Sequence, residues 1–483
     1  MNATQCEVFP KSEMPKAQFP TARNILAGTF LPFSLGAAAL LLNSTFAPQA
    51  EAAAFTYTGT LNIGRVSPSA TLLPNGKVLV SGGSNSGALS SAELYNPATE
   101  MWTLTGTMTT ARNAHAAILL PNGKVLAAAG QSGASPLSSA ELYDPSTGQW
   151  TPTGSLNVAR IGPSATLLLN GKVLVAGGTD SSYFGIASAE LFDPTTGQWT
   201  PTGPLNVARA APAVLLPNGQ VLVAGGIANL LDGTSILSSS EVYDSITGNW
   251  TLTGTLTTPR YGSTMNSLPV SGKVLITGGF LFTPTSSSLS TTELYDPALR
   301  TWRASGVLGT SRYGQTATLL VSGLVLVVGG ISYDTGVSSR LASAELYDPT
   351  SEIWSAAGDL NTARNAHKAV LLQNNKVLVL GGFAAGSPSL ITLASAEIYT
   401  PSTGGLPGVM LTHAARSPTN TFQFSFSSTP SASFTVLRAT SPSAPLSNWA
   451  SVVGLIETSP GQYQFNDTQA VTNRASFYRV RSP

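Results

Sequence analysis

One segment occurs seven times along the chain, and this repetition constrains the fold more than any other feature. The third copy begins at Trp150, contains an apolar run that ends at Gly177-Gly178, and closes at Asp193-Pro194. The second residue of the equivalent pair lies at positions 83, 130, 178, 226, 279, 330 and 382, so successive copies are 47, 48, 48, 53, 51 and 52 residues apart. A period of about 40 to 50 residues indicates a propeller or a solenoid.

Each copy is expected to form four short strands, lettered A to D. A first strand such as 69–73 leads to Asn75-Gly76, a dipeptide that suits the two-residue type I′ turn of a hairpin. The next run, such as 77–80, is apolar on both faces and predicts a central strand. In four copies the third strand ends at an Asp-Pro dipeptide, which suits a type I turn, and the fourth strand begins at the Trp.

The copies differ in length almost wholly between strands B and C. From the Gly pair to the following Glu there are 9, 10, 11, 14, 13, 14 and 14 residues in successive copies. The A–B turns are short and uniform, whereas these B–C segments vary and are longer in the last four copies. Such variation is typical of surface loops.

Three kinds of residue recur at fixed places. All copies keep one Arg and one Glu, and six keep a Trp: Arg65, Arg112, Arg160, Arg209, Arg260, Arg312 and Arg364; Glu93, Glu141, Glu190, Glu241, Glu293, Glu345 and Glu397; Trp102, Trp150, Trp199, Trp250, Trp302 and Trp354. With the Gly pair and a Tyr or Phe before each Trp, this order resembles the Kelch repeat over roughly residues 55 to 401. The resemblance implies an all-β fold, a seven-bladed Kelch β-propeller, and leaves the function open.

The copy that lacks a Trp predicts how the ring closes. The last copy ends at Tyr399-Thr400-Pro401 without a fourth strand, whereas residues 55–59 match the Trp-Thr-x-Thr-Gly segment with Phe55 in place of Trp. An open propeller would expose two sheet edges, and closure removes them. We therefore expect 55–58 to be the outer strand of the seventh blade.

Residues 1–54 are predicted to be a secretory signal peptide. Three basic residues precede an uncharged stretch at 25–42, and Ala52 and Ala54 follow, as at an Ala-x-Ala cleavage site. Cleavage would make the protein secreted or place it in the cell envelope, would leave no stable membrane span, and would remove Cys6, the single cysteine. The alternative is an uncleaved membrane anchor, since the apolar stretch is near the lower length limit for a span.

A second domain is expected after the repeats. Residues 402–410 are rich in Gly and Pro and predict a linker. Within 411–483, apolar and polar residues alternate in five runs, at 421–427, 433–439, 448–453, 462–467 and 476–481. This pattern predicts a C-terminal β-sandwich and resembles immunoglobulin-like or fibronectin type III modules.

Composition and motifs exclude several function classes. The net charge is +1 and no basic patch occurs, so nucleic acid is not an expected partner. No HExxH, Gly-x-Ser-x-Gly or P-loop motif is present, and we expect no cofactor, metal site or catalytic residue.

Because a catalytic site would not need one Arg and one Glu in every copy, we interpret these residues as hydrogen-bonded structural pairs. The alternative is a ring of ligand-binding Arg side chains.

One enzyme family has a similar expected architecture. Galactose oxidase and related copper radical oxidases resemble this chain in joining a seven-bladed Kelch propeller to an immunoglobulin-like domain. Their chemistry implies a tyrosine crosslinked to cysteine, a second tyrosine and two histidines on copper. Here the chain after the predicted cleavage site has no cysteine, and its histidines are His115 and His367, at equivalent places in two separate copies, and His413. A structural role is expected for the two repeat histidines.

We therefore expect a secreted, non-catalytic binding or scaffold protein with a protein or glycan ligand; the alternative is a galactose oxidase-like or other sugar-modifying propeller enzyme. In four antiparallel strands, the B–C loops and D–A connections lie at one end. Aromatic and polar residues in these segments form the candidate ligand-binding set: Tyr183, Phe184, Asp232, Tyr261, Phe280, Phe282, Tyr313, Tyr333, Asp334, Arg340 and Phe383. The longer loops predict that a partner docks on the last four blades, although any of these side chains could instead pack its own loop.

Overall fold

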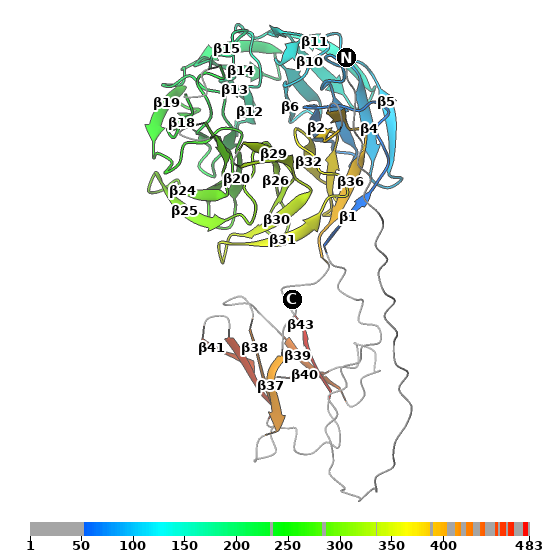
Figure 1. Cartoon of the computed structure of the whole chain (residues 1–483), viewed down its shortest axis with the longest axis vertical. Helices are drawn as coiled ribbons and strands as arrows, with labels where there is room; N and C mark the ends of the chain where they lie inside the picture. The colour runs from blue at the N-terminus through cyan, green and yellow to red at the C-terminus, as the bar shows by residue number, and fades with distance from the viewer. Residues whose placement is uncertain are drawn as a thin grey trace, which may run out of the picture. The chain divides into compact units, whose positions relative to one another are not determined.

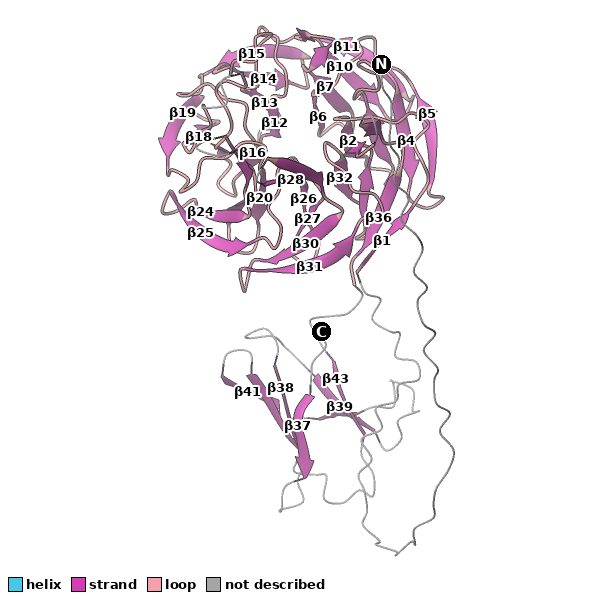
Figure 2. Cartoon of the chain, in the orientation of Figure 1, coloured by secondary structure: helices cyan, strands magenta, loops and turns pink. Residues whose placement is uncertain are grey.

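The structure, a computed structural model, describes residues 53–231, 235–282, 286–334, 336–386 and 390–402, together with the C-terminal strands given below. Residues 1–52 of the predicted signal peptide, Cys6, Asp232 and residues 403–410 of the predicted linker lie outside the described residues. The chain divides into two compact units, one within Ala47–Gly405 and one that contains Leu406–Pro483. All regular elements of the described part are β-strands, so it contains no helix that could cross a membrane (Figure 2).

The first unit is a ring of seven four-stranded antiparallel sheets, as the repeat predicts (Figure 1). Blade 1 contains β2 (Ser69–Leu72), β3 (Val78–Ser81), β4 (Ala92–Asn96) and β5 (Met101–Thr105). Blades 2 to 4 contain β6 (Ala116–Leu119), β7 (Val125–Ala128), β10 (Ala140–Asp144) and β11 (Gln149–Thr153); β12 (Ser164–Leu167), β13 (Val173–Ala176), β14 (Ala189–Asp193) and β15 (Gln198–Thr202); and β16 (Ala213–Leu215), β17 (Val221–Ala224), β18 (Ser240–Asp244) and β19 (Asn249–Thr253).

The remaining blades follow the same order from strand A to strand D. They contain β20 (Thr264–Leu268), β21 (Lys273–Thr277), β24 (Thr291–Asp296) and β25 (Thr301–Val307); β26 (Thr316–Leu319), β27 (Val325–Val328), β30 (Ser343–Asp348) and β31 (Ile353–Asp359); and, in blade 7, β32 (Lys368–Leu371), β33 (Val377–Leu380), β36 (Ala396–Thr400) and β1 (Ala54–Tyr57). Each A strand contacts the A strands of both neighbouring blades, so these seven inner strands surround the axis of a closed ring.

The core lies between adjacent blades. Every B strand is buried along its length apart from Lys273, as its apolar sequence predicts. In six blades the Trp of strand D packs on the Tyr or Phe opposite it on strand C, with ring centroids 5.0–5.2 Å apart. These tilted aromatic pairs fix the outer strand of each blade against strand C of the same blade.

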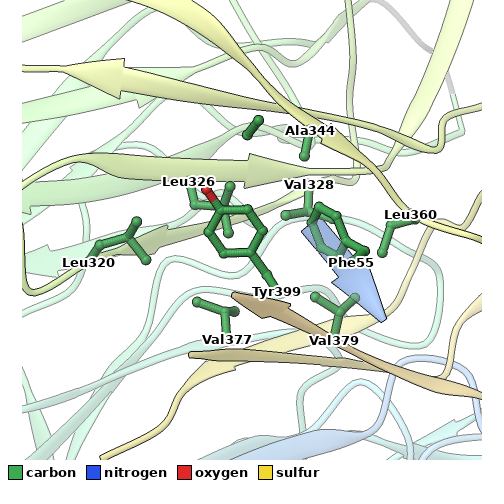
Figure 3. Packing of buried hydrophobic residues seen from close by; sticks show 10 residues of the cluster. Phe55, Leu320, Leu326, Val328, Ala344, Leu360, Val377, Val379 and Tyr399 are labelled. Carbon is green, nitrogen blue, oxygen red and sulfur yellow. The ribbon is translucent and has the colours of Figure 1, made fainter. Parts of the chain in front are cut away.

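Ring closure follows the prediction made from the missing Trp. Strand β1 pairs antiparallel with β36 in the register Phe55↔Tyr399, and the two rings are 5.0 Å apart, as in the other blades. Blue β1 lies beside orange β36 in Figure 1, and Figure 3 shows Phe55 and Tyr399 with Val377 and Val379 in the core between blades 6 and 7. The N-terminal strand therefore covers the edge that β36 would otherwise expose.

The Gly pair is required where blades meet. The second glycine donates its backbone N–H to the backbone carbonyl of the repeat Arg in the next blade, as Gly83 does to Arg112 over 2.9 Å. Gly82 has a φ of 61°, and a Cβ there would lie 2.4 Å from the Arg112 carbonyl oxygen. Glycine meets both demands at the lowest cost, although one blade accepts alanine there. Blade 2 has Ala129 at the first position, with a φ of 62°.

Several B–C loops form small hairpins of their own. These are β8 (Gln131–Ser132) with β9 (Ser135–Pro136), β22 (Phe280–Leu281) with β23 (Ser287–Ser288), β28 (Ile331–Asp334) with β29 (Val337–Arg340), and β34 (Phe383–Ala384) with β35 (Ile391–Thr392). Three of the four belong to blades 5 to 7, where the sequence has longer loops.

The second unit contains two antiparallel sheets. One has the order β37 (Leu411–Arg416), β38 (Phe422–Ser427), β42 (Gln462–Asp467) and β41 (Leu455–Ser459), and the other has the order β40 (Ala450–Val452), β39 (Thr435–Ala439) and β43 (Phe477–Arg481). All five predicted runs contain a strand, whereas β37 and β41 fall outside them. Packing of the two sheets as a sandwich stays a prediction.

Hydroxyl pairs link five of the seven blades to the one before; blade 3 has Phe192 in place of the Tyr, and blade 7 is the other exception. The Tyr hydroxyl of strand C lies 2.6–2.9 Å from a Thr or Ser hydroxyl on strand D of the preceding blade in five blades. For Tyr399 of blade 7, the equivalent residue on strand D of blade 6 is Ala357, and the buried Tyr399 hydroxyl has no hydrogen-bond partner among the described residues. Burial raises the pKa of Tyr399 to about 12.

Replacing Ala357 with Ser should therefore stabilise the protein. Ser305, at the equivalent place in blade 5, lies 2.7 Å from the Tyr347 hydroxyl, so Ala357→Ser copies an existing pair and should raise the free energy of unfolding by about 1 kcal/mol. Thermal and urea unfolding would measure the gain. Ala356→Ser, at an exposed position on the same strand, is the control and should change little. A lower melting temperature for Ala357→Ser would contradict this account of Tyr399.

Candidate functional site

The end of the propeller that carries the B–C loops and D–A connections is called the loop face here. In every blade the residue after the repeat Arg forms a β-bridge with the residue after the Gly pair, from Val66↔Ser84 in blade 1 to Asn365↔Phe383 in blade 7. These bridges tie each B–C loop to the adjoining connection. The loop face is therefore a set of short segments held on a rigid base.

The repeat Arg and Glu form that base. In each blade an Arg Nη2 lies 2.6–2.9 Å from a Glu Oε1, and all seven guanidinium groups are buried. In blade 3, Arg160 Nη1 also donates to the carbonyls of Gly177 and Ser188, while Glu190 accepts backbone N–H groups from Asn157 and Val158. One pair thus joins the ends of strands B and C to the D–A connection.

These contacts confirm the structural interpretation of the pairs and exclude the alternative of a ligand-binding Arg ring. Burial lowers the pKa of each Arg, and the charge of its Glu opposes that effect. A guanidinium with 0–1% of its side chain exposed cannot touch a ligand on the surface.

Loss of one Arg should be costly. Arg160→Ala would leave the buried carboxylate of Glu190 without its cation, and we expect a loss of about 3–5 kcal/mol in the free energy of unfolding. Urea denaturation would measure it. Lys172→Ala is the matched control, because Lys172 pairs with Asp193 at 3.2 Å on the surface of the same blade and should contribute at most about 1 kcal/mol. Equal losses for the two variants would contradict the assignment.

Four of the predicted site residues form one aromatic cluster on blades 5 and 6. Phe280 is at its centre, with ring centroids 4.9 Å from Phe282, 4.7 Å from Tyr313 and 5.6 Å from Tyr333. Phe280 is only 7% exposed and is in ring contact with the other three, so it forms the base of the cluster. Phe282, Tyr313 and Tyr333 remain partly exposed and form the accessible surface of the aromatic cluster.

The remaining predicted residues surround this cluster or lie apart from it. Tyr261 is bridged to Phe280, and burial raises its pKa, as it does that of Tyr313. Arg340 donates from Nε to Asn365 Oδ1 over 2.9 Å and lies close enough to Tyr313 for its charge to lower the pKa of that phenol. Asp334 is exposed at the tip of its hairpin.

The aromatic residues of blades 3 and 7 are separate from the cluster. Tyr183 and Phe184 are 37% and 48% exposed, and their loop pairs with the blade 4 loop through Phe184↔Asn229. Phe383 is bridged to Asn365. Among the described residues, no ring contact joins these three side chains to the aromatic cluster. The structure therefore brings together only part of the predicted ligand-binding residues.

Known proteins share the repeat. Residues 65–109, 112–157 and 162–206 match the Kelch motif. Kelch-like protein 23 of Mus musculus is 29% identical over 142 residues, which are 29% of this chain and 23% of that protein. An F-box/kelch-repeat protein of Arabidopsis thaliana is 34% identical over 159 residues, 32% of this chain and 40% of that protein. The matches thus span less than half of each relative.

The chain is a Kelch-repeat β-propeller. Three matched motifs and seven blades with the same buried pair support this assignment. A solved structure described as a novel fungal alcohol oxidase of the AA5 family, in complex with copper, is similar with a TM-score of 0.56 and 17% identity, covering 88% of this chain and 95% of that one. At this identity the similarity shows the fold alone.

The two repeat histidines of the Kelch propeller lie in inter-blade contacts. His115 Nε2 lies 3.1 Å from Ser69 Oγ, and His367 Nε2 lies 2.9 Å from Thr316 Oγ1, in each case on the preceding blade. Burial and nearby cations lower the pKa of both to about 3, so both are neutral at neutral pH. No group of three His, Cys, Asp or Glu side chains suited to a metal occurs within the described residues.

The propeller should lose stability in mild acid because of these histidines. The pKa of each histidine is about 3 in the folded protein and about 6.5, the ordinary value, in the unfolded chain. Below pH 6.5 the unfolded chain therefore binds more protons than the folded one. The free energy of unfolding should fall by about 1.4 kcal/mol per pH unit for each His as the pH drops from 6.5 toward 4.5.

Urea denaturation across this range would measure the slope, with His115→Gln as the comparison. Gln315 occupies the equivalent place in blade 6 and donates to the Thr277 carbonyl, so Gln is accepted there. The variant should lose one histidine's share of the slope. An unchanged slope would mean that His115 is accessible to protons in the folded protein.

Sequence reasoning missed one residue near the axis. Lys368 is the first residue of β32, where four other blades carry Ser69, Ser164, Thr264 and Thr316. Aligning the copies at this position would have singled it out, because it is the only charged side chain on the seven inner strands.

Proposed function

We propose that this Kelch propeller is a non-catalytic binding or scaffold protein that recognises a protein or carbohydrate ligand through its loop face. The observation that supports this most is the aromatic cluster, in which Phe282, Tyr313 and Tyr333 are partly exposed around buried Phe280. Aromatic anchors on a firm base provide contact area at low entropic cost and often dominate recognition. The predicted signal peptide supports action outside the cytoplasm.

The base of the cluster supports preorganised binding. Arg260 of blade 5 and Arg312 of blade 6 are buried, and each is paired with the Glu of its own blade at 2.7 Å. Tyr261 and Tyr313 directly follow these arginines and are bridged to Phe280 and Ile331. A surface built in this way loses little conformational entropy when a ligand docks.

Exposed apolar residues also occur at the opposite end, but they are arranged differently. Leu169, Val270 and Val321 are 74%, 95% and 70% exposed and belong to A–B turns of three different blades. Single exposed apolar side chains are common on soluble proteins, whereas a contiguous aromatic group is less so. They serve as controls for the loop face.

The test uses the whole protein on a glycan array and a random-peptide display library. For any ligand that the parent selects, Phe282→Ala with Tyr333→Ala should weaken binding by about thirtyfold or more, the equivalent of losing one anchor. Buried Phe280 is left in place so that the fold is retained, which circular dichroism would check. Val270→Ala with Val321→Ala, on the opposite end, should bind as the parent does.

Unchanged affinity in the aromatic double variant would place recognition elsewhere. Stoichiometric copper in the purified protein would contradict the non-catalytic part of the proposal and favour an enzyme of the galactose oxidase type. His413, the third histidine, lies on β37, and its side chain is outside the described residues.

A further inference from the structure

The hairpin formed by β28 and β29 carries a cation that no carboxylate of the described residues neutralises. Arg340 is half-buried, and its Nε donates to Asn365 Oδ1 of blade 7 over 2.9 Å. Neither of its Nη atoms has a hydrogen-bond partner in the ranges that the structure describes. Every repeat Arg there has its own Glu, and exposed Arg303 pairs with Glu352, whereas no ion pair in those ranges involves Arg340.

The register of the hairpin places this cation beside two rings of the aromatic cluster. Ile331 pairs with Arg340 and is bridged on its other side to Tyr313, so the Arg340 and Tyr313 side chains lie on the same face. Tyr333 follows two residues after Ile331, on that face and diagonal to Arg340, within reach of a long side chain. The charge of Arg340 opposes the rise in the pKa of Tyr313 that burial causes. Asp334 projects from the other face of the hairpin.

Hydrogen bonds hold the hairpin from both sides. Ser288 Oγ accepts the backbone N–H of Tyr333 over 2.9 Å and lies 2.7 Å from Ser311 Oγ. Ser311 Oγ in turn lies 3.2 Å from Ser332 Oγ. These contacts fix the hairpin to the loop of blade 5, and the bond from Arg340 fixes it to blade 7. The cation and the rings are therefore preorganised for a ligand.

We infer that this surface binds an acidic polysaccharide, with Arg340 holding the carboxylate of a uronic acid unit whose ring packs on Tyr313 and Tyr333. A guanidinium matches a carboxylate in both shape and charge. The C–H face of a sugar ring can pack on an aromatic ring, and sugar hydroxyls suit groups that both donate and accept. Such groups here are the two tyrosine hydroxyls and exposed Ser338, which pairs with Tyr333 across the hairpin.

This inference rests on the proposed function, because it names the ligand of the same loop face. An acidic peptide would offer the same carboxylate without the flat C–H face and the ring hydroxyls. It is therefore the contrasting ligand in the test.

The full-length protein can be tested by biolayer interferometry on immobilised polygalacturonate, alginate and hyaluronate, which differ in their uronic acids. The parent should bind at least one of them, and should bind the same polymer less tightly once its carboxyl groups are reduced to hydroxymethyl groups. Arg340→Met should weaken binding of the acidic polymer by about tenfold or more, the loss expected for one charge-assisted hydrogen bond, and leave binding of the reduced polymer unchanged. A merely structural role of Arg340 would weaken binding of both polymers equally.

Two further variants make the test specific. Asn365→Asp keeps the shape of the Arg340 partner but supplies the carboxylate that this Arg lacks, so it should also weaken binding of the acidic polymer alone. It decides the matter if Arg340→Met does not fold, which thermal unfolding would show. Arg303→Met removes an exposed Arg from strand D of blade 5 and should bind as the parent does.

Equal binding of the acidic and reduced polymers by the parent would overturn the inference, as would failure to bind any of the three polymers. Tighter binding of poly-glutamate than of the polysaccharides would assign the site to an acidic peptide instead. Loss of binding in Phe282→Ala with Tyr333→Ala, but in neither Arg340→Met nor Asn365→Asp, would contradict this inference and leave the proposed function intact.

Discussion

The buried Arg–Glu pair is the interaction on which the rest of this propeller depends. Each pair joins strand B, strand C and the D–A connection of its own blade, as Arg160 does through Gly177, Ser188 and Glu190. The backbone carbonyl of the same Arg accepts the N–H of the glycine from the preceding blade. One residue per repeat thus organises its blade through its side chain and binds the neighbouring blade through its main chain. Because both charges are buried and paired with each other, removing either partner leaves a charge that water cannot reach.

The sequence predicted the propeller and its closure for reasons that recur in every blade. Seven copies of one pattern limit the possible folds, and a Phe in place of Trp at residue 55 showed which strand closes the ring. These are local signals: turn dipeptides, apolar runs and a fixed order of side-chain types that recurs in each copy. The buried state of the pairs could also be predicted, since an ion pair present in every repeat has to serve the repeat itself.

The binding surface was predicted less well because it depends on contacts between loops of different blades. The residues of the aromatic cluster come from separate repeats, and nothing in the spacing of Phe280 shows that Phe282, Tyr313 and Tyr333 cover it. Lys368 was missed for a related reason: its environment is set by neighbouring inner strands rather than by its own loop. The unpaired hydroxyl of Tyr399 likewise results from an alanine 42 positions earlier, in the preceding blade.

The pairing of β1 with β36 has a mechanical consequence. In this ladder Ala54 lies opposite Thr400, so the first and last residues of the ring are cross-strand neighbours at the same end of two antiparallel strands. A pulling force applied to these two points would act across the ladder and open its hydrogen bonds one after another, each of them weak on its own. The β1–β36 pairing that completes the ring would therefore be the first pairing to separate under tension.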